Sequence, residues 1–246
     1  MHHDDPAERQ QRLRAAVQAL QAWQAAAHDA LRDEAQGGGL PRLDEPALRA
    51  ALALFLQACA QPTGAARPRG LDRALDLLVS GALAQPAVAL RRAWPAAAGA
   101  RGDGPPAADA ASGPAIRPTL RGPWLFDLAG LLMDPSLACG EEERIDAAVR
   151  WWQQARRSAP ALGQALAEDF GECWRALEWT ALLQQLQRIG ALCAQAQDEG
   201  LAPHTAALAP LARTASGIAL RYAPLAPLLV LLEPFAGQGL SRGFTF

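Results

Sequence analysis

Hydrophobic residues recur at helical spacing along most of this chain. In the first segment Leu13, Val17 and Leu20 lie three or four positions apart, so they would share one face of a helix. Asp44 stands at a favoured N-cap position before a second such segment, with Pro46 in its first turn. The pattern predicts helices over residues 6–32, 44–60, 71–84, 124–132, 141–157, 163–197 and 205–232, the last of these interrupted by its prolines.

Strand-like patterns are confined to two short apolar runs, at residues 86–90 and near residues 115–120. Between residues 95 and 114 the chain consists almost entirely of Ala, Gly, Pro, Asp and Ser. That composition is typical of a loop, because it offers no large side chain to bury. The sequence therefore predicts a mainly α fold with at most a small β-hairpin.

Composition narrows the classes of partner. Of the 246 residues, 50% are hydrophobic and 20% are charged, and the formal net charge is −2. There is enough apolar material for a core, and no excess of positive charge to attract nucleic acid or an anionic membrane. The N-terminal segment is charged and Gln-rich, unlike a signal peptide, and no apolar run is long enough to span a membrane. We expect a cytoplasmic protein that binds neither nucleic acid nor membrane.

The residues that could bind a metal ion are scattered along the chain. Cys59, Cys139, Cys173 and Cys193 show no CxxC or other ligand spacing. His2 and His3 lie at the N-terminus, and His28 and His204 have no nearby partner in the sequence. The sequence therefore predicts no metal site, and cysteines that are buried and reduced.

Four segments, in order along the chain, carry motifs of a known family. They are Leu40-Pro41 with Leu43-Asp44-Glu45; Gly122 to Leu128 with Leu131-Leu132; Leu177-Glu178-Trp179 with Leu182, Leu186 and Ile189-Gly190; and Arg221-Tyr222 with Leu225 to Leu229. Together they resemble the kinase-like aminoglycoside phosphotransferase family. Within it, the closest branch is the bacterial cell-wall amino-sugar (N-acetylmuramate/N-acetylglucosamine) kinases.

This resemblance implies the helical C-terminal lobe (C-lobe) of a protein-kinase-like fold. In the family a β-rich N-terminal lobe (N-lobe), which holds the nucleotide, precedes the first motif, whereas residues 1–39 here are predicted to be helical. The expectation is a C-lobe with no N-lobe. Its divisions would be an N-terminal helical segment at 1–39, a kinase-like lobe at 40–235 with the low-complexity loop at 95–114, and a flexible tail at 236–246.

The resemblance also locates the catalytic positions, and three of them hold alanine. The run Ala84 to Val88 is similar to the segment before the family's catalytic loop, which puts Ala93 at the catalytic aspartate and Ala98 at the metal-binding asparagine. Ala115 stands at the metal-binding aspartate of the second motif. Alanine can neither accept a proton nor bind Mg²⁺, and the chain contains no lysine to hold phosphates and no asparagine. We expect no catalytic residue, no metal and no cofactor.

Three residues remain as candidates for a role in a site. Asp127 matches the family's acid that braces the catalytic loop from the cleft floor, but a structural carboxylate at a helix start would look the same. Glu178 and Trp179 are candidates for substrate binding. Five tryptophans could either stack on a sugar or pack in a core, and for Trp179 we predict the core; they are Trp124, Trp151, Trp152, Trp174 and Trp179.

Three functions stay open on this evidence. The leading one is a degenerate, non-catalytic member of the family that binds a protein partner or a small molecule, or a relic of a decaying gene. The second is an active phosphotransferase that acts on an amino sugar or aminoglycoside with ATP and Mg²⁺. The third is an unrelated helical interaction protein.

Overall fold

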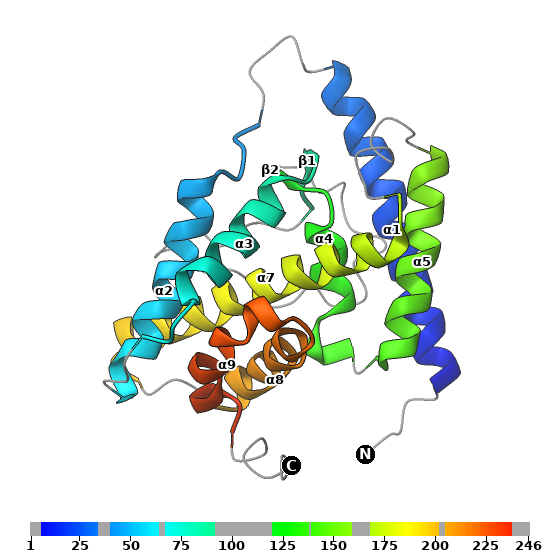
Figure 1. Cartoon of the computed structure of the whole chain (residues 1–246). Coiled ribbons are helices and arrows are strands. Elements are labelled where there is room, and N and C mark those ends of the chain that lie inside the picture. The colour runs from blue at the N-terminus through cyan, green and yellow to red at the C-terminus, as the bar shows by residue number, and fades with distance from the viewer. Residues whose placement is uncertain are drawn as a thin grey trace. The chain divides into compact units, whose positions relative to one another are not determined.

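The computed structural model describes residues 6–33, 40–63, 67–91, 120–137, 139–158, 168–201 and 205–237 (Figure 1). Over these residues the fold is mainly helical with one two-stranded sheet, which confirms the predicted class. The elements are α1 (Pro6–Asp33), α2 (Glu45–Thr63), α3 (Leu71–Leu83), β1 (Ala87–Ala89), β2 (Arg121–Pro123), α4 (Phe126–Leu132), η3 (Pro135–Leu137), α5 (Glu141–Ser158), α7 (Phe170–Asp198), α8 (Thr205–Arg221), η4 (Ala223–Leu225), α9 (Pro227–Leu232) and η5 (Glu233–Phe235).

The elements group into two compact units, and each is described by itself. We call the first the hairpin unit; it holds α1, the two strands, α4, η3, α5 and the start of α7 as far as Leu177. We call the second the helical unit; it holds α2, α3 as far as Gly81, α7 from Glu178, and the elements from α8 to η5.

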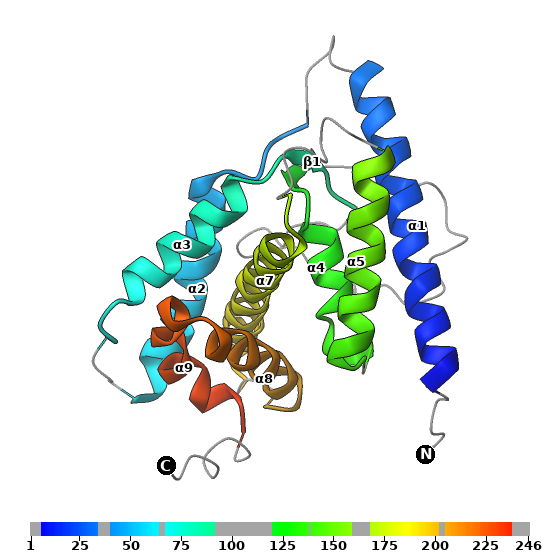
Figure 2. The ribbon, with the colours of Figure 1, turned by 45° about the vertical axis from the view of Figure 1, so that its right-hand side comes forward.

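In the hairpin unit, α1 and α5 lie side by side and run in the same direction (Figures 1 and 2). Polar side chains fix their register. The Gln21 amide donates to the Trp151 carbonyl at 3.2 Å, and the Trp151 indole donates to the Gln24 side chain at 3.4 Å. Arg14 and Asp146 form an ion pair at 3.7 Å. The predicted apolar face of α1 is buried as expected, with Leu13, Val17 and Leu20 each at most 4% exposed.

The sheet pairs β1 with β2 in antiparallel register, with Val88 opposite Gly122. The first strand lies where the sequence predicts it, but the second begins at Arg121, beyond the predicted run at 115–120. This segment has no apolar strand pattern, and it forms a strand because it pairs with β1 in the folded unit. A Cβ on Gly122 would stand 2.6 Å from the end of the Leu90 side chain, so glycine fits here without displacing Leu90.

The helical unit is built on one close helix–helix approach. A Cβ on Gly190 of α7 would lie 2.5 Å from the backbone nitrogen of Phe55 in α2, so these backbones touch without an intervening side chain. The α8 helix packs on α9 and on both flanking 3₁₀ turns. We expected Pro210 to interrupt the last helices, but α8 runs through it unbroken. Pro227, in contrast, opens α9 at a first-turn position that suits proline.

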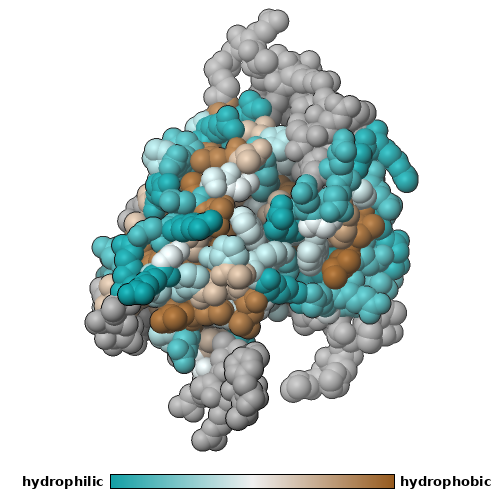
Figure 3. Space-filling model, in the orientation of Figure 1, coloured by the Kyte–Doolittle hydropathy of each residue, from teal (hydrophilic) through white to brown (hydrophobic). Residues whose placement is uncertain are grey.

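Figure 3 shows mostly polar residues on this face, with brown apolar residues in small separate groups. The large apolar residues that are most exposed are Leu201, Leu220 and Val230. Among the described residues, no helix combines the length and apolarity needed to cross a membrane.

Candidate functional site

Asp127 lies at the base of the hairpin, in the first turn of α4. The side chain is buried, with the residue 2% exposed, and its Oδ2 accepts the backbone N–H of Arg91 at 2.7 Å. A carboxylate that accepts a backbone N–H forms a charge-assisted hydrogen bond, which is stronger than a neutral one. Asp127 thus fixes the chain at Arg91, two residues before Ala93.

Other polar contacts hold the same part of the hairpin unit. The Gln85 side chain accepts the backbone N–H of Leu125 at 3.1 Å, so the turn before α4 is tied to the chain before β1. On the other side, β2 exchanges hydrogen bonds with residues 41–43, and the Leu90 N–H donates to the Leu120 carbonyl at 2.9 Å. The chain is therefore held on both sides of residues 92–119.

The three alanines at the expected catalytic positions lie outside the described residues. Ala93, Ala98 and Ala115 all fall between Arg91 and Leu120, which are the described residues on either side of this gap. The low-complexity loop at 95–114 and most of the tail at 236–246 fall outside it as well. The domain bounds and the catalytic positions drawn from the sequence stay predictions.

Glu178 is fully buried in the helical unit and is bound by Arg221, the last residue of α8, and by Tyr222, which follows it. The Tyr222 hydroxyl donates to its Oε2 at 2.5 Å, and Arg221 Nη2 lies 3.2 Å from its Oε1. A carboxylate inside protein needs partners of this kind, because burial removes its hydration. Since both oxygens are engaged and the residue is 0% exposed, the geometry favours a structural role for Glu178 over contact with a substrate.

Trp179 is less buried than predicted. The residue is of intermediate exposure, its ring meets Tyr222 edge-on at 5.8 Å between centroids, and it packs close to Gly81. Its indole N–H is buried without a hydrogen-bond partner in the described part of the chain. Part of its surface therefore contacts other residues of the helical unit and part reaches solvent.

The remaining tryptophans do not form one platform. Trp124 and Trp151 are core residues of the hairpin unit, 4% and 1% exposed, with ring centroids 5.5 Å apart. Trp152 and Trp174 are partly exposed, and each has Phe170 as an aromatic neighbour. The sequence prediction treated these residues as one group, whereas the structure divides them into a core pair and a surface row.

Sequence reasoning missed several buried polar residues. Gln184, Gln185 and Gln187 of α7 are at most 5% exposed, although glutamine usually faces water. The residues around them are buried on every side of this stretch of helix, so no amphipathic pattern marks it. Gln85 was also missed, because only the folded hairpin shows which backbone group it binds.

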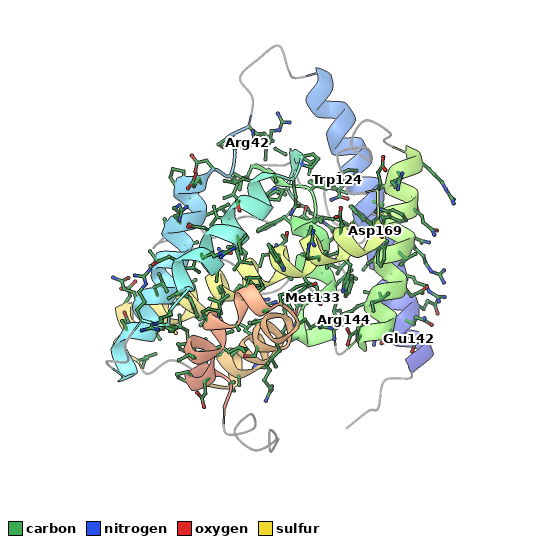
Figure 4. The ribbon with its side chains drawn as sticks, in the orientation of Figure 1. Arg42, Trp124, Met133, Glu142, Arg144 and Asp169 are labelled. Atoms are coloured by element: carbon green, nitrogen blue, oxygen red, sulfur yellow. The ribbon has the colours of Figure 1, made fainter. Side chains whose placement is uncertain are left out.

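Figure 4 shows another anchor of the hairpin unit, with Arg144 beside Met133. Arg144 Nη1 lies 3.3 Å from the Met133 sulfur. Within the described ranges, no three residues among His, Cys, Asp and Glu come together as a metal site would require.

Burial sets the chemistry of the cysteines. It raises the pKa of Cys173 to about 12, and it raises the pKa of Cys59 to about 12 with a further contribution from the charge on nearby Cys193. Burial also raises the pKa of Cys193. A thiol with a raised pKa carries little thiolate near neutral pH, so these residues are poor nucleophiles.

Comparison with known proteins shows a relationship to a sugar kinase. The chain is 32% identical over 128 residues to an N-acetylmuramate/N-acetylglucosamine kinase of Neisseria meningitidis serogroup B. The alignment covers 52% of this chain and 37% of that kinase. No family model matches the chain, and no solved structure matches it.

Proposed function

We propose that this chain is a non-catalytic relative of the sugar kinases that binds a ligand or partner without transferring phosphate. In this proposal it belongs to the aminoglycoside phosphotransferase family, and the described helices and hairpin correspond to a kinase-like C-lobe. Support comes from the similarity to the Neisseria kinase and from the four motifs in order. A relic of a decaying gene would share the lack of activity.

The proposal rests on one observation, the absence of the residue types that phosphoryl transfer needs. None of the 246 residues is lysine or asparagine, and Ala93, Ala98 and Ala115 stand at the three catalytic positions that the resemblance assigns. Phosphoryl transfer depends on positioning the reactants and neutralising phosphate charge, and the residues that do both are substituted. ATP and Mg²⁺ therefore do not fit this set of side chains.

Asp127 has a structural role in this proposal. It would hold the segment that starts at Arg91 from beneath, as a cleft-floor acid does, although the segment lacks a catalytic aspartate. The 2.7 Å contact with the Arg91 N–H supports this role. Glu178 would be a second structural acid, and a ligand would have to use other groups.

The alternative is an active amino-sugar or aminoglycoside phosphotransferase that uses ATP and Mg²⁺. The identity to a curated kinase favours it. It requires a base and metal ligands other than residues 93, 98 and 115, or residues supplied by a second chain.

An assay of ADP release separates the two. The purified chain is incubated with ATP and N-acetylmuramic acid, N-acetylglucosamine or kanamycin, with and without Mg²⁺, and a sugar kinase of the Neisseria type serves as positive control. We expect no release above background, since loss of general-base help alone lowers rates by about 10²–10⁴-fold. Sugar-stimulated, Mg²⁺-dependent turnover of even about 0.1 per second, below the typical kinase range, would refute the proposal. Thermal shift with ATP and Mg²⁺ should likewise show no stabilisation.

A further inference from the structure

The exposed residues from 217 to 230, at the end of α8 and along η4 and α9, are nearly all apolar. Leu220 of α8 and Val230 of α9 are 55% and 54% exposed, although these two helices pack on each other. Of the other exposed residues in this range only Arg221 is charged, and the rest are Gly217, Ala223, Pro224 and Ala226. We call Leu220, Val230 and these four residues the α8–α9 face. Figure 3 shows one of the brown groups over α8 and α9, in the lower part of the view.

The core of the helical unit does not include Leu220 or Val230. Its large apolar side chains from α8 and α9 are each at most 3% exposed, and they are Leu208, Leu211, Ile218, Leu228 and Leu232. Leu220 and Val230 therefore keep apolar area in water on neighbouring helices. An exposed apolar patch of this kind, bordered by charged residues, is typical of a surface that binds another protein.

Two residues of opposite charge border the α8–α9 face. Arg213 lies on α8 four residues before Gly217, and Glu233 follows Val230 by three residues at the start of η5. These spacings place each charge on the same side of its helix as part of the face. Both residues are exposed, and neither side chain is paired with another described residue. The face thus has one cation and one anion at its border.

We propose that the α8–α9 face binds a second copy of this chain and forms a two-fold symmetric dimer. In such an interface the same surface meets itself, so every contact occurs twice. Arg213 of each copy would pair with Glu233 of the second copy, while Leu220 and Val230 of both copies would be covered. This dimer would form whether or not the chain transfers phosphate.

Other partners use the α8–α9 face less completely. Nucleic acid or an anionic membrane would attract Arg213 but would also meet the Glu233 carboxylate. A purely apolar segment would cover Leu220 and Val230 and leave both border charges unpaired. A second copy covers the apolar residues and offers each charge its opposite, which is the electrostatic complementarity that gives an interface its specificity.

The test is sedimentation of the purified chain in low salt over a range of concentrations. We expect a reversible dimer with a dissociation constant of about 20 μM, since the face is small. Leu220→Gln should weaken the dimer about tenfold, because symmetry removes the apolar contact twice. Arg213→Glu and Glu233→Arg should each weaken it at least about tenfold, since each places like charges together twice. The double variant, with both charges exchanged, should restore the constant to within about threefold.

Arg157→Glu, on α5 of the hairpin unit, is the matched control because it reverses another exposed charge. It should leave the dissociation constant within about twofold. A chain that stays monomeric at about 200 μM, ten times the expected constant, would overturn the inference, also where another segment of the same chain covers the face.

The variants decide whether a dimer forms through this face. Dimerisation that neither charge reversal weakens would overturn the assignment to the α8–α9 face. A double variant no better than the single ones would overturn the pairing of Arg213 with Glu233. If a charge variant does not fold, as judged by circular dichroism, Leu220→Gln decides, because a dimer that it does not weaken is not formed through this face.

Discussion

Two buried carboxylates, Asp127 in the hairpin unit and Glu178 in the helical unit, are held differently. Asp127 of the hairpin unit accepts a backbone N–H, whereas Glu178 of the helical unit is held by the side chains of Arg221 and Tyr222. The glycines show the same contrast. Gly122 approaches the side chain of Leu90, and Gly190 approaches the backbone of α2. In the hairpin unit, a buried side chain positions a stretch of backbone. In the helical unit, the contacts join whole helices to one another.

This contrast predicts where substitution is least tolerated. Gly190→Ala should lower the free energy of unfolding by about 3 kcal/mol, because the new Cβ would meet backbone that can move only with the helix. Gly122→Ala should cost about 1–2 kcal/mol, since the Leu90 side chain can rotate away. Urea denaturation measures both. Gly217→Ala is the control: it lies on α8 with nothing within 4 Å and should be neutral or slightly stabilising. If the two substitutions lowered the free energy of unfolding equally, the proposed difference between the two units would be wrong.

The carboxylate of the helical unit should be sensitive to loss of its ion-pair partner. Arg221→Ala leaves Glu178 buried with one partner fewer, and we expect a loss of about 2–3 kcal/mol. The value is at the low end for a buried pair because the Arg221 side chain is 36% exposed. Arg175→Ala, which breaks only the exposed pair with Glu172, should change stability by less than about 0.5 kcal/mol. If Arg221→Ala lowered the free energy of unfolding no more than Arg175→Ala does, Glu178 would not need Arg221 to remain buried.

The carboxylate of the hairpin unit should show a smaller and more local effect. Asp127→Asn keeps the shape and an acceptor oxygen but removes the charge, and we expect a loss of about 1–2 kcal/mol. Hydrogen exchange followed by mass spectrometry should show faster exchange at Arg91 and in the neighbouring hairpin. Unchanged exchange there, with a loss of stability elsewhere, would contradict the local role of Asp127.

The smallest expected effect is on the dependence of stability on pH. The pKa values of Cys59 and Cys173 are raised to about 12 by burial, so the folded chain disfavours the thiolate. Each therefore contributes stability that is fully present below the ordinary thiol pKa and is lost as pH rises toward about 12. Melting temperatures measured from pH 8 to 11 should fall less steeply in Cys59→Ala, for the helical unit, and Cys173→Ala, for the hairpin unit. Parallel curves for wild type and variants would show that the thiols are not buried as described.

Sequence patterns predicted the helices well because amphipathic spacing reports which face is buried. The face of Leu13, Val17 and Leu20 and the start of α3 at Leu71 are examples. The second strand was misplaced because Arg121-Gly122-Pro123 has no strand pattern, and only its pairing with β1 makes it a strand. Pro210 was read as a break, yet α8 runs through it unbroken.

The candidate site could be predicted only in part. The motifs pointed to Asp127, Glu178 and Trp179, but the partners of those residues depend on tertiary contacts. Neither the Arg91 N–H nor the pairing of Glu178 with Arg221 can be derived from spacing, since each joins positions more than thirty residues apart. The surface row was missed for a related reason, because Trp152 and Phe170 become neighbours only after α5 and α7 pack.

The chain's one tyrosine gives the helical unit an internal spectroscopic reporter. Tyr222 donates its hydroxyl to the Glu178 carboxylate and lies 5.8 Å from the Trp179 ring. A phenol bound to a carboxylate fluoresces weakly, and at this distance its excitation passes to the indole. Tyrosine emission should therefore be nearly absent in the folded chain and appear when the end of α8 separates from α7. A single emission band would then follow the opening of one unit without any added label.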